Sequence, residues 1–292
     1  MIIVKLMGGL GNQMFQYAAA KALAEHHGVL LKVDLSFLND RSAKENFTFR
    51  EYELSCFDTS IEIASKDEIS IFNPKNRFYR YMMTFLGISM PLHYYEQSFK
   101  YYELFNQLPK ETLLEGYFQS EKYFIQIKPL LLENFKWLSP ASGINLKLIE
   151  SIQTVNSVSL HIRRGDFVEN KVINSFHGLC DINYYERAIS EINNSMKNPT
   201  FFIFSDDIKW AKKKFDLIPS VIFIDHNKGK ESYWDMRLMS LCNHNIIANS
   251  SFSWWAAWLN KNPNKIVITP SFWFRNPDIN TMDLIPLNWR KL

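Results

Sequence analysis

Cysteine, glycine and proline are all scarce in this chain of 292 residues, which has 3, 10 and 11 of them. Cys56, Cys180 and Cys242 lie far apart and form no Cys-x-x-Cys pair, so we expect free thiols in a reducing compartment. The low glycine and proline content excludes a collagen-like or low-complexity chain. With 47% hydrophobic and 22% charged residues, the composition also excludes a disordered protein.

Charge of one sign is scarce too, because 33 Lys and Arg against 30 Asp and Glu give 33 − 30 = +3. A dedicated nucleic-acid binder usually carries a strong basic field, so we expect no nucleic-acid partner. A local basic pocket for one anionic ligand remains open. No run of 18 apolar residues and no signal-peptide pattern occur, which predicts a cytoplasmic protein without a transmembrane helix.

Metal-ligand patterns are missing as well. No Asp-x-Asp pair occurs, and no His, Cys and Asp spacing suggests a zinc site, so we expect no metal. Aromatic residues, in contrast, are abundant, with 23 Phe, 13 Tyr and 8 Trp making up 15% of the chain. Such a surplus indicates flat surfaces for sugar rings or bases, or a surface that touches a membrane.

The order of the expected elements indicates an α/β protein of about two domains. The segment 138–143 is rich in Pro, Gly and Ser and predicts a boundary between domains 1–140 and 141–292. In the first domain we expect strands at 2–6, 29–33 and 112–118, and helices at 15–27 and 120–135. In the second we expect strands at 158–162, 201–204, 221–224, 246–248 and 266–268, alternating with helices at 184–196, 208–215, 232–242 and 252–259. Such alternation predicts parallel sheets with ligands at the carboxyl ends of the strands.

Two polar clusters follow strands of the second domain. His161, Arg163, Arg164 and Asp166 lie in the segment HIRRGD, where arginines suit an anionic ligand. The alternative is a structural ion pair of one arginine with Asp166. In the segment SDD at 205–207, we expect Ser205 or Asp206 to cap the next helix.

A third cluster, NSSFSWW at 249–255, joins a strand to a helix. Hydroxyls and free N–H groups at a helix N-terminus form a phosphate seat, although a serine cap on a core helix fits as well. We expect Trp254, Trp255 and Trp258 to be core residues rather than a sugar platform.

The N-terminal turn Gly9-x-Gly11, with Asp34 after the next strand, is similar to a dinucleotide-binding fingerprint. Met14 stands where a third glycine is needed, so the match is weak. It nevertheless keeps an NAD-dependent oxidoreductase as one alternative function. A glycan-binding protein without catalysis is another, because of the aromatic surplus.

Four segments together resemble the α-1,2-fucosyltransferases of glycosyltransferase family 11. In chain order they are GGLGNQMFQY at 8–17, GYFQSEKYF at 116–124, HIRRGD at 161–166, and CNHN at 242–245 leading to NSSFSWWAAWL at 249–259. The resemblance implies a GT-B fold of two Rossmann-like domains facing across a cleft. It also implies transfer of L-fucose from GDP-β-L-fucose to the 2-hydroxyl of a terminal β-galactoside, with inversion and without a metal.

The resemblance also implies a role for each matching residue on the donor side. His161 is expected to contact guanine, Asp235 to pair with its N–H groups, and Arg163 to bind the β-phosphate, with Arg164 assisting or holding the turn. The other donor-binding residues that the resemblance implies are the diphosphate turn Ser251, Phe252 and Ser253 and the closing loop of Gly9, Gly11 and Asn12.

The acceptor side is less defined. Asp166, Glu169 and His177 are candidates for the general base, and we prefer Asp166, whose rival role is to hold the arginine turn. We expect the acceptor to be a free, lipid-linked or polysaccharide-terminal glycan. Residues 40–110 are expected to shape most of the acceptor site. A lipid-linked acceptor predicts peripheral contact with the inner face of the membrane.

Overall fold

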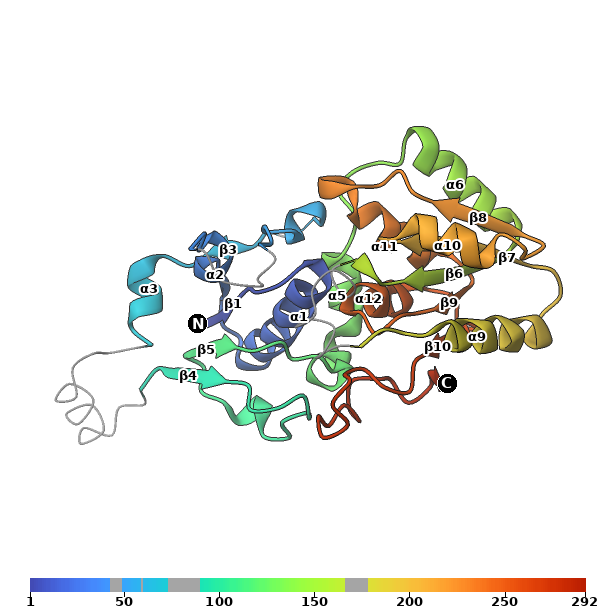
Figure 1. Ribbon diagram of the computed structural model, residues 1–292. Coiled ribbons are helices and arrows are strands. Elements are labelled where there is room, and N and C mark those ends of the chain that lie inside the picture. Colours follow the sequence, from blue (N-terminus) through green and yellow to red (C-terminus); the bar gives the residue numbers. More distant parts are fainter. Residues whose placement is uncertain (43–48, 59, 73–89, 166–177) are drawn as a thin grey trace. The chain divides into compact units, whose positions relative to one another are not determined.

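The computed structural model describes residues 1–42, 49–58, 60–72, 90–165 and 178–292. They form two compact units, one of residues 1–136 with Met282–Leu284 and one of residues 137–281 with Ile285–Leu292. Each unit has its own sheet and helices, coloured blue to green and green to red in Figure 1. The return of Met282–Leu284 to the first unit was not expected from the sequence.

The first unit contains a five-stranded sheet in the order β3-β2-β1-β5-β4, and its neighbouring strands are parallel. The strands are β1 (Ile2–Lys5), β2 (Leu31–Asp34), β3 (Glu62–Ile63), β4 (Leu92–Tyr95) and β5 (Thr112–Glu115). Helix α1 (Leu10–His27) packs against β1 and β2 and ends at Gly28, which has φ 62°. The shorter helices are α2 (Ser36–Asn39), η1 (Leu54–Cys56), α3 (Lys66–Ser70), η2 (Phe105–Gln107), η3 (Glu121–Tyr123), η4 (Ile125–Ile127) and α5 (Lys128–Asn134).

Two helix predictions for this unit are wrong at their bounds. The expected helix 120–135 is broken into η3, η4 and α5, because Pro129 lacks an N–H and is tolerated only in the first turn of a helix. Helix α1 begins at Leu10 instead of residue 15, since the Glu53 carboxylate accepts a hydrogen bond from the Leu10 N–H at 3.1 Å. Gly11 and Asn12 therefore lie in the first helical turn.

The second unit contains a six-stranded parallel sheet in the order β11-β10-β9-β6-β7-β8. The strands are β6 (Asn156–Ile162), β7 (Pro199–Ser205), β8 (Val221–Ile224), β9 (His244–Ile246), β10 (Val267–Thr269) and β11 (Arg290–Lys291). The helices are α6 (Gly143–Thr154), α9 (Ile182–Ser195), α10 (Ile208–Phe215), η5 (Gly229–Glu231), α11 (Tyr233–Leu241) and α12 (Ser251–Leu259). The expected alternation is confirmed, while α6 was not predicted.

The side chains of β6 point alternately to the two faces of the sheet. Val158, Leu160 and Ile162 pack with residues of α9 and α10 in one buried cluster. The residues between them point to the opposite face, where β6 contacts α6 and α11. His161 belongs to this second face.

Each sheet has one point where the strand order reverses. The chain runs from β6 to β7 and β8 and then returns to β9 on the other side of β6. In the first unit β2 and β3 lie on one side of β1, and β5 and β4 lie on the other. Ligands of open α/β sheets bind at the carboxyl ends of the strands at such points. The loops after β1, β5, β6 and β9 are therefore the places to look for function.

Candidate active site

The basic cluster after β6 is held by acids that follow β7. The guanidinium of Arg163 lies 2.7 Å from Asp206 Oδ2, and the Arg164 N–H donates to Asp206 Oδ1 at 2.8 Å. The register of the two parallel strands, in which Ile162 pairs with Ser205, places these residues side by side. A Cβ on Gly165 would lie 2.9 Å from Asp206 Oδ2, so glycine lets the carboxylate approach the turn.

Arg164 has a different environment from Arg163. Its Nε lies 3.2 Å from Asp207 Oδ2, and its guanidinium lies over the Trp210 ring at 4.1 Å. Asp207 caps α10 by accepting the Trp210 N–H at 3.1 Å, whereas Ser205 or Asp206 was expected to be the cap. Arg164 thus ties the turn to α10, and its contact with a donor stays a prediction.

His161 is buried and neutral at physiological pH. Its ring centroid lies 5.9 Å from that of Phe252, so the structure brings together residues that follow β6 and β9. Burial lowers the pKa of the imidazole to about 4; the carboxylate of Asp206 opposes the shift and the charge of Arg163 adds to it. Nδ1 has no hydrogen-bond partner among the described residues. A neutral ring of this kind suits a base edge better than a phosphate.

The start of α12 offers backbone donors. Ser250 is the N-cap residue and makes no side-chain cap bond, and no acidic residue stands in the first turn. The first N–H donating to the cap carbonyl is that of Trp254, so the N–H groups of Ser251, Phe252 and Ser253 precede the helical ladder. Together with the helix dipole they favour an anion.

The side chains of this segment divide into two groups. The Ser253 hydroxyl is buried and bonds to the Ala248 and Ser250 carbonyls, so Ser253 can offer a ligand only its backbone N–H. Trp254, Trp255 and Trp258 are at most 3% exposed, which confirms that they are core residues.

Asp235 lies in the first turn of α11 with a separate set of partners. Asn227 donates to its carboxylate at 2.8 Å and is itself held by Asn145 of α6 at 3.0 Å. His226 bonds to the same Asn145 at 2.8 Å. Burial raises the pKa of Asp235 to about 7, and the hydrogen bond from Asn227 opposes that rise. The carboxyl group is therefore partly protonated near pH 7. Two N–H groups that donate hydrogen bonds to it, such as those of a guanine edge, would favour its ionised form.

The glycine turn of the first unit is braced by side chains from elsewhere in the unit. Gly8 has φ 73°, and a Cβ there would lie 2.5 Å from Asn12 Nδ2. The side-chain Oδ1 of Asn12 accepts a hydrogen bond from Gln119 Nε2 at 2.9 Å. Gln13 Nε2 donates to the Gly8 carbonyl at 2.8 Å. Asn12 is thus fixed between the loops that follow β1 and β5.

Gln16 joins the same two loops from inside α1. Its Oε1 accepts the Met7 N–H at 2.9 Å, and its Nε2 donates to the Gly116 carbonyl at 3.0 Å. Beyond Gly116, the Glu96 carboxylate accepts the N–H groups of Tyr117 and Phe118 at 2.6 and 3.0 Å. The segments 8–17 and 116–124 therefore form one structure at the strand-order reversal.

Asp34 does not fit the dinucleotide interpretation. Its side chain is 1% exposed, and Oδ1 accepts the Ser36 N–H at 2.7 Å. The carboxylate that would bind a ribose hydroxyl is therefore buried, and one of its oxygens is bonded to the Ser36 N–H. This geometry argues against NAD.

The candidates for the general base, Asp166, Glu169 and His177, lie outside the described residues. Within the described ranges, no three His, Cys, Asp or Glu side chains are grouped to hold a metal ion. The same part of the chain contains no helix long and apolar enough to span a membrane.

Comparison with known proteins decides the family. The model of the family Glycosyl transferase family 11 matches residues 1–289. An alpha-1,2-colitosyltransferase of Escherichia coli is 37% identical, covering 100% of this chain and 98% of that protein. The chain belongs to glycosyltransferase family 11.

Two further relatives of this transferase extend the comparison. The O-antigen biosynthesis glycosyltransferase WbnK of Escherichia coli is 35% identical over 95% of this chain and 97% of its own length. The galactoside 2-alpha-L-fucosyltransferase Sec1 of Mus musculus is 24% identical over 89% of this chain and 64% of its own length.

A solved structure shows the same fold. A mutant of Arabidopsis thaliana FUT1 in complex with GDP matches with a TM-score of 0.52 at 13% identity, covering 91% of this chain and 69% of that chain. With its two parallel sheets, the family 11 transferase has the expected GT-B fold.

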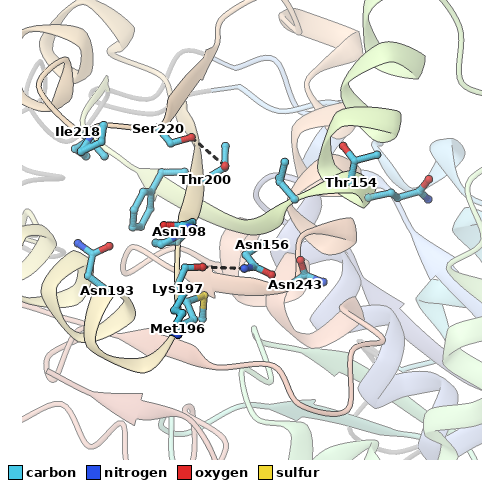
Figure 2. Close-up of a pocket in the computed structure, with 15 residues that line it drawn as sticks. Thr154, Asn156, Asn193, Met196, Lys197, Asn198, Thr200, Ile218, Ser220 and Asn243 are labelled. Carbon is cyan, nitrogen blue, oxygen red and sulfur yellow. Dashed lines mark hydrogen bonds between the residues drawn. The ribbon is translucent and has the colours of Figure 1, made fainter.

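One cavity of this transferase lies away from Arg163 and the start of α12. Figure 2 shows it, with a volume of about 1140 Å³, among the starts of β6 and β7 and the end of α9. Asn156 and Thr200 line it, bonded to the Lys197 carbonyl and the Ser220 hydroxyl. It therefore lies at the amino edge of the sheet, and of the family segments only CNHN reaches it, through Asn243.

Several residues that hold the family 11 motifs in place were not predicted from the sequence. Asp206 was interpreted only as part of a cap, although its position after the neighbouring strand could have paired it with Arg163. Glu53 and Asn227 gave no signal, and Gln119 lies in the segment 116–124 without its partner Asn12 being evident, because each acts through a contact distant along the chain or set by a loop.

Proposed function

We propose that this protein is an inverting galactoside α-1,2-fucosyltransferase that uses GDP-β-L-fucose and needs no metal. The observation that carries the proposal is the Arg163–Asp206 pair at the strand-order reversal of the second sheet, two residues after His161, whose ring meets Phe252 in the open start of α12. A fixed guanidinium and free N–H groups match a diphosphate leaving group. The family and the named activity of the mouse relative support the sugar and the linkage.

In the proposed reaction, the bond between the anomeric carbon of fucose and the β-phosphate oxygen breaks. The bond from the acceptor O2 to the anomeric carbon forms on the opposite face. Negative charge grows on the β-phosphate as the bond breaks, and the positive charge of Arg163, oriented by Asp206, offsets it. The acceptor proton passes to a base, for which Asp166 remains our first choice.

The guanine is assigned to His161 and Asp235. Asp235 accepts the two N–H groups of the guanine edge, which favours its ionised form. His161 stays neutral and contacts the base beside Phe252. The N–H groups of Ser251, Phe252 and Ser253 bind the diphosphate, and Arg164 holds the turn.

The first unit is assigned to the acceptor, with Gly9, Gly11 and Asn12 closing over the diphosphate and fucose. Gly9 leaves its backbone accessible to a ligand, because a Cβ there would meet nothing closer than 3.7 Å. A lipid-linked acceptor would bring the enzyme to the inner face of the cytoplasmic membrane.

A second donor deserves a direct test, because the relative at 37% identity is named an alpha-1,2-colitosyltransferase. The same phosphate and guanine contacts serve any sugar carried on GDP. Parallel assays with a fucosyl and a colitosyl donor separate the two activities.

Titration of GDP and NAD against tryptophan fluorescence tests the nucleotide class. We expect saturable GDP binding, with an affinity that Arg163→Ala lowers and Lys212→Ala leaves unchanged. Lys212 is a matched control, because it forms an exposed ion pair with Asp225 in the same unit. Tight NAD binding without GDP binding would overturn the proposal.

A further inference from the structure

A cavity of about 500 Å³ lies in the first unit, among the residues that follow β4. Four tyrosines line it, and we call it the tyrosine pocket. Its lining consists of Tyr94, Gln97, Ser98, Lys100, Tyr101, Tyr102, Glu103, Leu104 and Tyr123. The volume falls within the roughly 300–1,000 Å³ of small-molecule sites. Its position beyond the carboxyl end of β4 is on the edge where such sheets bind ligands.

A buried aromatic base supports the pocket. Tyr123 is 2% exposed, and its ring meets those of Tyr101, Phe105 and Phe118 at 4.8, 4.7 and 5.6 Å. Phe105 and Phe118 are fully buried. The inner wall of the pocket is therefore rigid, which lowers the entropy lost when a ligand binds.

The outer rings keep exposed surface on this base. Tyr102 is 37% exposed and stacks on Tyr94, with ring centroids 5.6 Å apart and planes 19° apart. The Tyr102 N–H donates to the Tyr123 hydroxyl at 3.1 Å, and the Tyr101 N–H donates to Asp283 at 3.0 Å. The backbone that carries the outer rings is thus tied to the base of the pocket.

The polar groups of the tyrosine pocket suit a neutral, hydroxyl-rich ligand. Lys100 and Glu103 carry opposite charges, so the lining has no net charge. Burial raises the pKa of Tyr94 to about 12, and its hydroxyl stays protonated and can donate a hydrogen bond. Flat rings with hydroxyl tips present one apolar surface and a polar rim. A pyranose ring has the same division between its C–H face and its hydroxyls.

We propose that the tyrosine pocket binds a neutral pyranose ring of the acceptor glycan, with the C–H face of the sugar against Tyr102, whose ring is backed by Tyr94. This assignment rests on the proposed transfer to a galactoside and adds the place where the acceptor is held. It also gives the aromatic surplus of the sequence a specific use.

Three variants test the assignment by steady-state kinetics and by binding of a β-galactoside without donor. Tyr102→Ala removes the ring, Tyr102→Phe keeps it, and Tyr95→Ala is the matched control. Tyr95 follows Tyr94 on β4, so its side chain points to the face of the sheet opposite that of Tyr94. It does not line the pocket. We expect Tyr102→Ala to raise the acceptor KM and the galactoside Kd about tenfold. Tyr102→Phe and Tyr95→Ala should keep both within about twofold.

GDP binding separates failure of this inference from failure of the proposed function. If all variants bind GDP and transfer sugar with an unchanged acceptor KM, the tyrosine pocket is not an acceptor site and the proposed function stands. If the wild-type protein binds no GDP, the proposed function fails first. Sedimentation with phosphatidylglycerol vesicles adds one outcome. Vesicle binding lost in Tyr102→Ala, with the acceptor KM unchanged, overturns the sugar assignment in favour of a membrane contact.

Discussion

Arg163 is held in place by Asp206 before any ligand arrives, at a distance of 2.7 Å. The charge that the proposed reaction needs is therefore fixed in orientation, and little reorganisation is required when the leaving group becomes negative. We predict that Arg163→Ala lowers kcat by about 10²–10³-fold while the protein stays folded. Arg163→Lys should recover only part of this loss. The planar guanidinium can donate to Asp206 and to a phosphate at the same time, and the ammonium of lysine does not reproduce this geometry.

Transfer rates measured together with circular dichroism and Tm check this prediction. Lys212→Ala controls for the loss of one positive charge in the same unit. A rate near that of the wild type in Arg163→Ala would contradict the role of Arg163.

Asp235 gives the donor site a dependence on pH. Its pKa is raised to about 7 by burial, and pairing with guanine N–H groups would lower that pKa in the complex. Binding then releases a proton below about pH 7, so we predict that GDP affinity falls about tenfold from pH 8 to pH 6.

Calorimetric titration of GDP at pH 6, 7 and 8 measures this effect, with Asp235→Asn as the control. The variant should bind GDP weakly at every pH, and its GDP affinity should no longer show the pH dependence that the ionisation of Asp235 causes. It should also raise the stability of the free protein at pH 8. The folded pKa lies above the unfolded one, so the native state loses stability as the pH rises from about 4 to 7 and Asn removes that loss. Equal pH profiles in both proteins would disprove the assignment.

Single residues were predictable where the sequence placed chemistry at a strand end. His161 is the penultimate residue of β6 and Arg163 the first residue after it, and a parallel sheet collects such positions at one edge. Asp206 follows the neighbouring strand and was available to the same argument. Asn227 and Gln119 were not predictable, because a loop and a contact across the unit bring them to their partners.

Among the elements, the loop after β5 packs closely against Glu96 at Gly116, and this loop is joined to the one after β1. A Cβ on Gly116 would lie 2.3 Å from Cβ of Glu96, whose carboxylate holds the next two backbone N–H groups. We predict that Gly116→Ala lowers the free energy of unfolding by about 1–3 kcal/mol, because either the turn or Glu96 must shift.

Urea unfolding compares this variant with Gly9→Ala. The nearest atom to a Cβ on Gly9 is 3.7 Å away, and its φ of −82° suits any residue, so this control should change stability by less than about 1 kcal/mol. Equal stability of Gly116→Ala and the wild type would show that the loop is not tightly fitted.

The elements themselves were predictable where periodicity and caps agree. The strands and helices of the second unit follow the expected alternation, and α12 begins within one residue of its predicted start. The start of α1 depends on Glu53, 43 residues from Leu10, which no local pattern reveals. Pro129 in the segment 120–135 did give a signal, and it restricts α5 to a short helix.

For the whole molecule, the C-terminal region returns to the first unit at Met282–Leu284. Asp283 is the centre of this return, because it bonds to Lys122 and to the Tyr101 N–H, and its carbonyl accepts the Ser120 hydroxyl at 2.6 Å. Burial would raise the pKa of Asp283, but these hydrogen bonds outweigh burial and lower it. The contribution of Asp283 to stability is therefore present above about pH 4 and is lost as the pH falls through its folded pKa.

We predict that Asp283→Ala lowers the free energy of unfolding at pH 7 by about 1–3 kcal/mol, since it leaves two donors without their acceptor. Glu133→Ala is the control, because it removes an exposed ion pair with Lys136 and should change stability by less than about 0.5 kcal/mol. Urea unfolding of the full chain measures both. An unchanged midpoint in Asp283→Ala would show that the return of the chain adds nothing to stability.

The overall class could be predicted from the alternation of strands and helices, and the family from four segments spread along the chain. The exchange of a three-residue segment between units could not be predicted, because 282–284 carries no periodic pattern and its anchoring depends on tertiary contacts.

The most direct test of the account is the structure of the product formed from GDP-β-L-fucose and a β-galactoside, determined by NMR. The account predicts an α-L-fucosyl group on O2 of the terminal galactose, with release of GDP and no requirement for an added divalent ion. A β-linked product, a different acceptor oxygen or no consumption of the donor would contradict it.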